Sequence, residues 1–149
     1  MKEKILFPFT AQNQGGSIIS ALNLAKSLSD ANYDIIFLVH GDGPAIKLIE
    51  KKKINYLITD IKFFENGENF FNFLFKLTTQ IISMIFILFK IKPDIIHIND
   101  SRMVNTWTLI SKLLGYKVII HQRTKPSKSK FLEFNLSKAN YIVAISKFI

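Results

Sequence analysis

A chain of 149 residues has room for one domain, and its 48% hydrophobic and 21% charged residues are typical of a globular protein, which excludes intrinsic disorder. The absence of cysteine excludes disulfides and cysteine-bound metals, and it fits a reducing compartment such as the cytoplasm. The net charge of +9 favours an anionic partner, although a lysine-rich composition would by itself make most surfaces basic.

Six short apolar runs predict the strands of a mostly parallel sheet. Each run is rich in Ile, Val, Leu, Phe or Tyr and almost continuously hydrophobic, which is typical of strands covered on both faces. Segments of helical period separate the runs, as expected for repeated strand–helix–strand units. The first run is also too short for the apolar core of a secretion signal. The predicted strands are Ile5–Phe9, Ile35–Val39, Tyr56–Thr59, Asp94–Ile98, Val118–His121 and Tyr141–Ile145.

Five segments predict helices. The first begins near Ser17, whose hydroxyl can accept a free backbone N–H of the first turn, and its period places Ser20 toward water. Pro93 ends the third helix, and Gly115 provides a left-handed cap for the fourth. Ser146 is a suitable N-cap for a further helix after the last strand. The other predicted helices are Ala45–Lys52, Asn69–Ile91, Met103–Leu114 and Lys130–Lys138.

The uncharged segment Leu77–Phe89 raises the question of a membrane crossing. A crossing needs about 20 apolar residues, whereas this segment is shorter and contains Thr78, Thr79, Gln80 and Ser83. We therefore predict a buried or surface-lying helix.

The alternation predicts a doubly wound α/β fold: a six-stranded Rossmann-like sheet with helices on both faces, forming one domain over residues 1–149. With the common strand order 3-2-1-4-5-6, ligands bind at the carboxyl ends of the first and fourth strands, where the order reverses. The loops after strands one, four and five are unusually polar beside almost wholly apolar strands. Topology and polarity thus predict one site at this edge.

The glycine pair after the first strand is the first candidate for ligand binding. Gly15, Gly16 and Ser17 open a helix, where glycine permits close approach and free N–H groups attract an anion. No dinucleotide fingerprint and no Walker A lysine pattern is present. A tight turn that only leads into the helix is the alternative interpretation.

The fourth and fifth strands supply the other candidates. His97 and Asn99 share one face of a strand, Asp100 begins the following loop, and a neutral imidazole or amide there could bind hydroxyl groups or orient an acceptor. His97 as a buried structural residue is the alternative. His121 and Arg123 repeat this arrangement, and Arg123 is the preferred anion contact.

Metal and nucleic-acid sites are disfavoured by the same residues. The two strand-end histidines lack a cysteine or a histidine–glutamate helical pattern that would complete a zinc site, so no metal is predicted. Among the residues from Lys112 onward only Glu133 is acidic, but aromatic side chains do not alternate with the basic ones as in nucleic-acid modules. An anionic substrate or membrane surface remains the predicted partner. The basic residues are Lys112, Lys117, Arg123, Lys125, Lys128, Lys130, Lys138 and Lys147.

The ordered motifs resemble the N-terminal domain of GT-B glycosyltransferases of the family 4 type. The matching pieces span nearly the whole chain in the expected order: the strand followed by Gly15-Gly16-Ser17, "NLAKSLSDANYDIIFLV", "KPDIIHIND", "KLLGYKVIIHQRT" and "SKANYIVAISKFI". The resemblance implies one half of a retaining enzyme that moves a sugar from a nucleotide-sugar donor to a cell-surface glycan or lipid-linked acceptor, at the cytoplasmic face of the membrane, without metal or other cofactor.

Two departures limit what the resemblance implies. Many relatives have a second histidine where this chain has Asn99, which leaves open whether Asn99 replaces a catalytic histidine. The donor-gripping residues belong to a C-terminal domain outside this sequence, so we expect the chain alone to be inactive. Two alternatives stay open: a non-catalytic Rossmann-like subunit of a two-chain enzyme, and half of a GT-B-like sugar-nucleotide epimerase.

Overall fold

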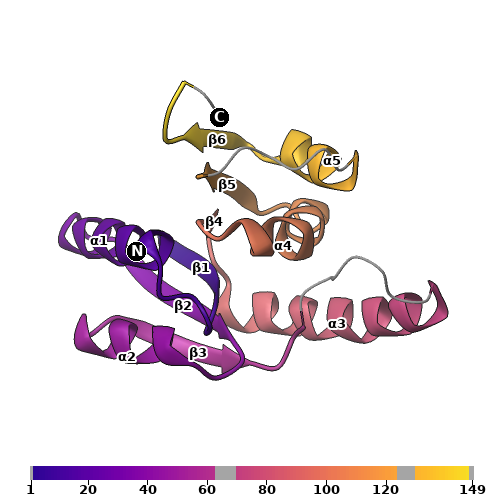
Figure 1. The fold of residues 1–149 in the computed structure, drawn as a ribbon, viewed down its shortest axis with the longest axis horizontal. Coiled ribbons are helices and arrows are strands. Elements are labelled where there is room, and N and C mark those ends of the chain that lie inside the picture. Colours follow the sequence, from indigo (N-terminus) through magenta and orange to yellow (C-terminus); the bar gives the residue numbers. More distant parts are fainter. Residues whose placement is uncertain (1, 63–69, 124–129, 148–149) are drawn as a thin grey trace.

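Strands and helices alternate along residues 2–62, 70–123 and 130–147, which the computed structural model describes (Figure 1). The strands are β1 (Lys4–Thr10), β2 (Asp34–His40), β3 (Asn55–Thr59), β4 (Ile95–Ile98), β5 (Lys117–Gln122) and β6 (Tyr141–Ala144). The helices are α1 (Gly16–Asp30), α2 (Pro44–Lys51), α3 (Phe70–Ile91), α4 (Ser101–Leu113) and α5 (Lys130–Lys138).

The six strands form one parallel sheet in the order β3-β2-β1-β4-β5-β6, which confirms the predicted strand order and the doubly wound α/β fold class. β1 pairs with β2 along all 7 of its residues. It pairs with β4 only through Ile5↔Ile95 and Leu6↔Ile96. The two central strands therefore separate toward their carboxyl ends, at the point where the strand order reverses.

Alternate residues of the central strands feed two separate cores. Phe7 and Phe9 of β1 pack with α1 and α2 on one face, and the Phe7 ring stacks on Phe37 with 5.1 Å between centroids. Leu6 packs with residues of α3 and α4 on the other face, around the fully buried Trp107. Figure 1 shows these helices on opposite sides of the sheet. Burial on both faces explains why the strands read as nearly continuous apolar runs.

The start of α1 corrects the sequence prediction. Gly15, and not Ser17, is the N-cap, and no side chain caps this end. The reason is local: the Gly15 N–H donates to Asn13 Oδ1 at 2.8 Å, and Asn13 Nδ2 donates to Ser17 Oγ at 2.6 Å. The Ser17 hydroxyl is thus engaged as an acceptor by the loop and lies inside the first turn.

Other boundaries differ from prediction by one or two residues. Asp94 precedes β4 because its carboxylate accepts the Lys4 N–H at 2.7 Å. α4 begins at Ser101 because Asp100 caps it, two residues earlier than predicted. Gly115 is left-handed (φ 83°) as predicted, one residue after the C-cap. The predicted start of the third helix at residue 69 and the helix expected after residue 146 involve residues outside those described.

Within the described part of the chain, none of the helices combines the length and the apolar character that a membrane crossing requires.

Candidate functional site

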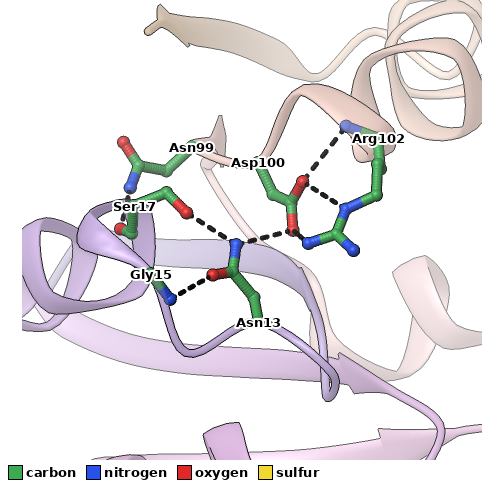
Figure 2. A network of polar contacts seen from close by, with 6 residues as sticks. All are labelled: Asn13, Gly15, Ser17, Asn99, Asp100 and Arg102. Atoms are coloured by element: carbon green, nitrogen blue, oxygen red, sulfur yellow. Dashed lines mark hydrogen bonds and ion pairs between the residues drawn. The ribbon is translucent and has the colours of Figure 1, made fainter.

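One asparagine, Asn13, makes the hydrogen bonds that fix the loop between β1 and α1. Asn13 accepts the Gly15 N–H, donates to Ser17 Oγ and lies 3.4 Å from Asp100 Oδ2, so it links this loop to the start of α4 (Figure 2). A Cβ added at Gly16 would meet nothing within 4 Å. The backbone there faces open space, and the uncapped first turn of α1 directs free N–H groups outward. This geometry suits an anion.

Asn99 braces the end of β4 against two neighbouring elements. The residue is 1% exposed, and its Nδ2 donates to the Ser17 carbonyl at 2.7 Å. Its Oδ1 accepts from Arg123 Nε at 3.2 Å. Both ends of the amide are therefore occupied by protein groups, and Asn99 fixes where Arg123 lies relative to α1.

Arg123 lies over the first turns of α1. Its Nη2 donates to Ser20 Oγ, although the helical period had placed Ser20 toward water. Partial burial lowers the pKa of Arg123, and no carboxylate among the described residues forms an ion pair with it. A cation that is positioned by neutral partners keeps its charge available for a ligand.

Asp100 differs from Arg123 because its charge is already compensated by an ion pair, with Arg102. Its side chain is 3% exposed, accepts the Arg102 N–H at 3.1 Å as the N-cap of α4, and receives two further hydrogen bonds from the Arg102 guanidinium at 3.1 and 3.0 Å (Figure 2). The sequence reasoning did not single out Arg102. In the sequence, Arg102 could have been recognised only by its position two residues after Asp100, the acid that caps α4. The structure gives Asp100 a structural role beside the glycine loop.

His97 and His121 lie behind this network on the α1 face of the sheet. Their rings meet edge to face with 6.1 Å between centroids, and His97 also packs on Phe7 at 4.8 Å. Burial, and then the neighbouring His121 and Arg123, lower the pKa of His97 to about 4; burial and Arg123 lower that of His121. Both imidazoles are neutral at pH 7. The buried Nδ1 of His97 has no hydrogen-bond partner among the residues that the structure describes.

A third histidine, at the end of β2, is part of the core. His40 Nδ1 lies 2.7 Å from the Ile61 carbonyl, and Trp107 Nε1 donates to His40 Nε2 at 2.9 Å. The second bond makes Nε2 the acceptor and Nδ1 the donor. Burial lowers the pKa of His40 to about 4. His40 joins the end of β2 to α4, at a sequence separation that no local pattern reveals.

The predicted site residues thus fall into one connected group. Gly15 and Ser17 contact Asn13, Ser17 also accepts from Asn99, and Asn13 reaches Asp100. Arg123 reaches α1 through Ser20, and Gly16 lies between Gly15 and Ser17 in the same loop. His97 and His121 adjoin this group from the sheet. Among the described residues, no three His, Asp or Glu side chains gather as metal ligands would.

Comparison with known proteins shows the fold of this chain. No family model matches the sequence, and no curated protein matches it. Among solved structures, MurG from Acinetobacter baumannii matches 95% of this chain and 41% of its own length (TM-score 0.72, 19% identity). HepE from Anabaena, in complex with UDP and glucose, matches 97% and 39% (TM-score 0.70, 19% identity). A putative UDP-N-acetylglucosamine 2-epimerase from Listeria monocytogenes matches 99% and 40% (TM-score 0.71, 13% identity).

The chain therefore spans about two fifths of the length of the solved structures that it matches. The likeness covers almost all of this chain at low identity, and it confirms the predicted architecture: a Rossmann-like α/β domain equivalent to one half of a GT-B fold.

Proposed function

We propose that this chain is the acceptor-side half of a GT-B glycosyltransferase of the family 4 type, which moves a sugar from a nucleotide-sugar donor with retention at the anomeric carbon. One observation carries the proposal: the uncapped first turn of α1, opened at Gly16, lies beside Arg123, a cation without a carboxylate partner among the described residues. Together they would hold the donor phosphates. The UDP and glucose bound by HepE, a protein of this fold, support a donor of that class.

The acceptor side of the proposal rests on His97, Asn99 and the loops beside them. A neutral His97 with an unpartnered Nδ1 could hydrogen-bond a hydroxyl group, whereas Asn99 holds Arg123 and would act through it. We propose a cell-surface glycan or lipid-linked molecule as acceptor. Residues 1–149 alone should transfer no sugar. Sugar transfer by this polypeptide would contradict the proposal that it is only the acceptor-side half of the enzyme.

The phosphate site can be tested on the isolated chain by titrating UDP-glucose and following backbone amide resonances. We expect the Gly15, Gly16 and Ser17 amides to shift, and Arg123→Ala and Gly16→Val each to weaken binding by at least about tenfold, roughly 1.4 kcal/mol. Lys26→Ala is the control, because Lys26 is exposed and pairs with Asp30 on α1. Undiminished binding in both variants would show that the donor phosphates bind elsewhere on the chain.

A sugar-nucleotide epimerase is the second candidate, since the Listeria epimerase shares this fold over 99% of the chain. A non-catalytic binding subunit of a two-chain enzyme is the third. Joining this chain to a donor-binding half and assaying the products distinguishes them. Transfer to an acceptor supports the first proposal, inversion at the sugar C2 supports the second, and nucleotide binding without turnover supports the third.

We also propose that the protein binds the anionic inner face of the cell membrane through α3. Three large apolar side chains follow one another at i, i+4 and i+7 on this helix and are strongly exposed: Ile82 (67%), Phe86 (74%) and Phe89 (61%). Lys90 is the only charged residue of α3 from position 78 to 91. An apolar stripe beside a cation on a chain of net charge +9 fits an anionic bilayer surface.

Co-sedimentation with phosphatidylglycerol-containing vesicles tests this membrane proposal. The double variant Phe86→Ser/Phe89→Ser should lose most of the bound fraction. Leu113→Ser, a matched change at a side chain 73% exposed on α4, should keep it. Binding should weaken at high salt, because screening removes the attraction of the basic residues. Equal binding by the two variants would exclude α3 as the contact.

A further inference from the structure

A pocket lies at the amino ends of the strands, at the edge of the sheet opposite the glycine loop. It holds about 640 Å³, room for a small organic molecule, and is formed by the end of α1, the start of β1 and the connection from α2 to β3. β1 is 7 residues long, so the two edges are about 20 Å apart. Asp34 is the only acidic residue that lines the pocket. Five lysines line it: Lys2, Lys4, Lys26, Lys52 and Lys53.

Two of these five lysines are already paired with carboxylates. Lys4 Nζ lies 3.9 Å from Asp34 Oδ2, and Lys26 Nζ lies 2.6 Å from Asp30 Oδ1. The remaining three are exposed, and their side chains form no ion pair or hydrogen bond with any residue that the structure describes. They are Lys2, Lys52 and Lys53. Cations gathered without counter-charges repel one another, and an anion between them relieves this repulsion.

The helix ends beside the pocket do not need these lysines as caps. A helix C-terminus attracts cations because its last carbonyl groups lack partners. In α2, however, the Lys52 N–H donates to the Ile49 carbonyl at 3.0 Å and the Lys53 N–H to the Glu50 carbonyl at 2.9 Å. Backbone N–H groups close the last turn of α1 in the same way. The three ammonium groups therefore stay available to a ligand.

Lys53 is a cation at a position where another residue would give a more stable backbone. It follows the C-cap of α2 and is left-handed, with φ 54°. Glycine or asparagine is favoured at this position, and α1 has Asn32 (φ 73°) there. A side chain such as that of lysine strains a left-handed backbone, which glycine adopts freely. Strain that is retained at a charged residue in a pocket points to binding.

We propose that this pocket binds a soluble molecule that carries two or three linked phosphate groups. β1 and β3 lie on either side of β2 and are about 10 Å apart, so the unpaired lysines reach the pocket from both sides. Linked phosphates hold several negative charges close together. Ammonium groups on flexible stems can gather around tetrahedral phosphates, and the pocket has no planar guanidinium of the kind that suits carboxylates. The inference goes beyond the proposed function and does not depend on it.

Sodium tripolyphosphate is the probe, titrated into the chain while the amide resonances of Tyr33 and Asn55, which line the pocket, are followed. We expect both amides to shift. Inorganic phosphate at the same ionic strength should bind at least about tenfold more weakly, because it carries fewer charges.

Lys53→Gly separates binding from stability. It should raise the urea midpoint, because glycine relieves the left-handed backbone, and yet weaken tripolyphosphate binding about fivefold. Lys92→Gly is the matched control, because Lys92 is also left-handed (φ 51°) but lies outside the pocket. It should raise the midpoint similarly and bind like the wild type. Lys2→Gln/Lys52→Gln changes no left-handed residue and should weaken binding at least about tenfold.

Undiminished binding by both pocket variants, an equal loss in Lys92→Gly, or equal affinity for inorganic phosphate would overturn the inference. A second arm uses phosphatidylglycerol vesicles. If Lys53→Gly loses vesicle binding that Lys92→Gly keeps, while both bind tripolyphosphate equally, the ligand is a lipid headgroup and the inference is also overturned. Lys53→Gly should keep the UDP-glucose response of the Gly16 amide, so failure here is distinguishable from failure of the proposed function.

Discussion

Two regions of this molecule bury a histidine with the same depressed pKa but use it differently. At the end of β2, His40 has both ring nitrogens engaged, by Ile61 and Trp107. At the end of β4, His97 has a buried Nδ1 with no hydrogen-bond partner in the described part of the chain. Burial lowers the pKa of each to about 4. A shifted pKa alone therefore does not mark a binding site, whereas the hydrogen-bond partners separate the structural histidine from the available one.

Replacing each histidine by leucine gives the largest expected effect and tests this contrast directly. His40→Leu leaves the Trp107 indole N–H and the Ile61 carbonyl buried without a partner, so we expect it to lower the free energy of unfolding by about 3 kcal/mol. His97→Leu removes no hydrogen bond at Nδ1 to a described residue and should cost less than about 1 kcal/mol. Urea denaturation at pH 7 measures both, and equal losses would break the comparison.

The pH dependence of stability should be shared by both regions. Each native imidazole ionises near pH 4 and each unfolded one near 6.5, so the unfolded chain binds more protons in this interval. Stability is therefore fully present above pH 6.5 and is lost as the pH falls toward 4, by about 3 kcal/mol per histidine. Urea midpoints between pH 7 and 4 should fall less steeply in either leucine variant than in the wild type. If the urea midpoint falls as steeply with pH in the variants as in the wild type, burial of these histidines does not cause the pH dependence.

The smallest expected effect concerns the glycine loop between β1 and α1, in the region that contains the available His97. Asn13→Ala removes the hydrogen bonds to Gly15 and Ser17 and should cost about 1 kcal/mol of stability. It should also weaken the UDP-glucose response severalfold, because the glycine loop loses its brace. Gln12→Ala, which removes one exposed bond to the Asp42 carbonyl in the same loop, is the matched control. A nucleotide response unchanged by Asn13→Ala would show that the loop needs no brace.

Much of the fold could be read from local patterns. Buried parallel strands are continuously apolar, helices repeat every three to four residues, and a reversal of strand order places the loops after β1, β4 and β5 together at one edge. The strand order and the grouping of Gly16, Asn99 and Arg123 followed from these rules. The assignment of the cap to Ser17 failed because a competing acceptor, Asn13, is recognised only from loop geometry.

By itself the sequence determined the elements, their order and the edge of the sheet where polar side chains collect, since these depend on periodicity and chirality. Only the tertiary structure decided which polar groups are occupied and which are free. Arg123 meets Ser20 across 103 positions of sequence, and His40 meets Trp107 across 67. Such pairs form where strands and helices pack, and their burial and geometry, rather than residue type, set how each side chain can act.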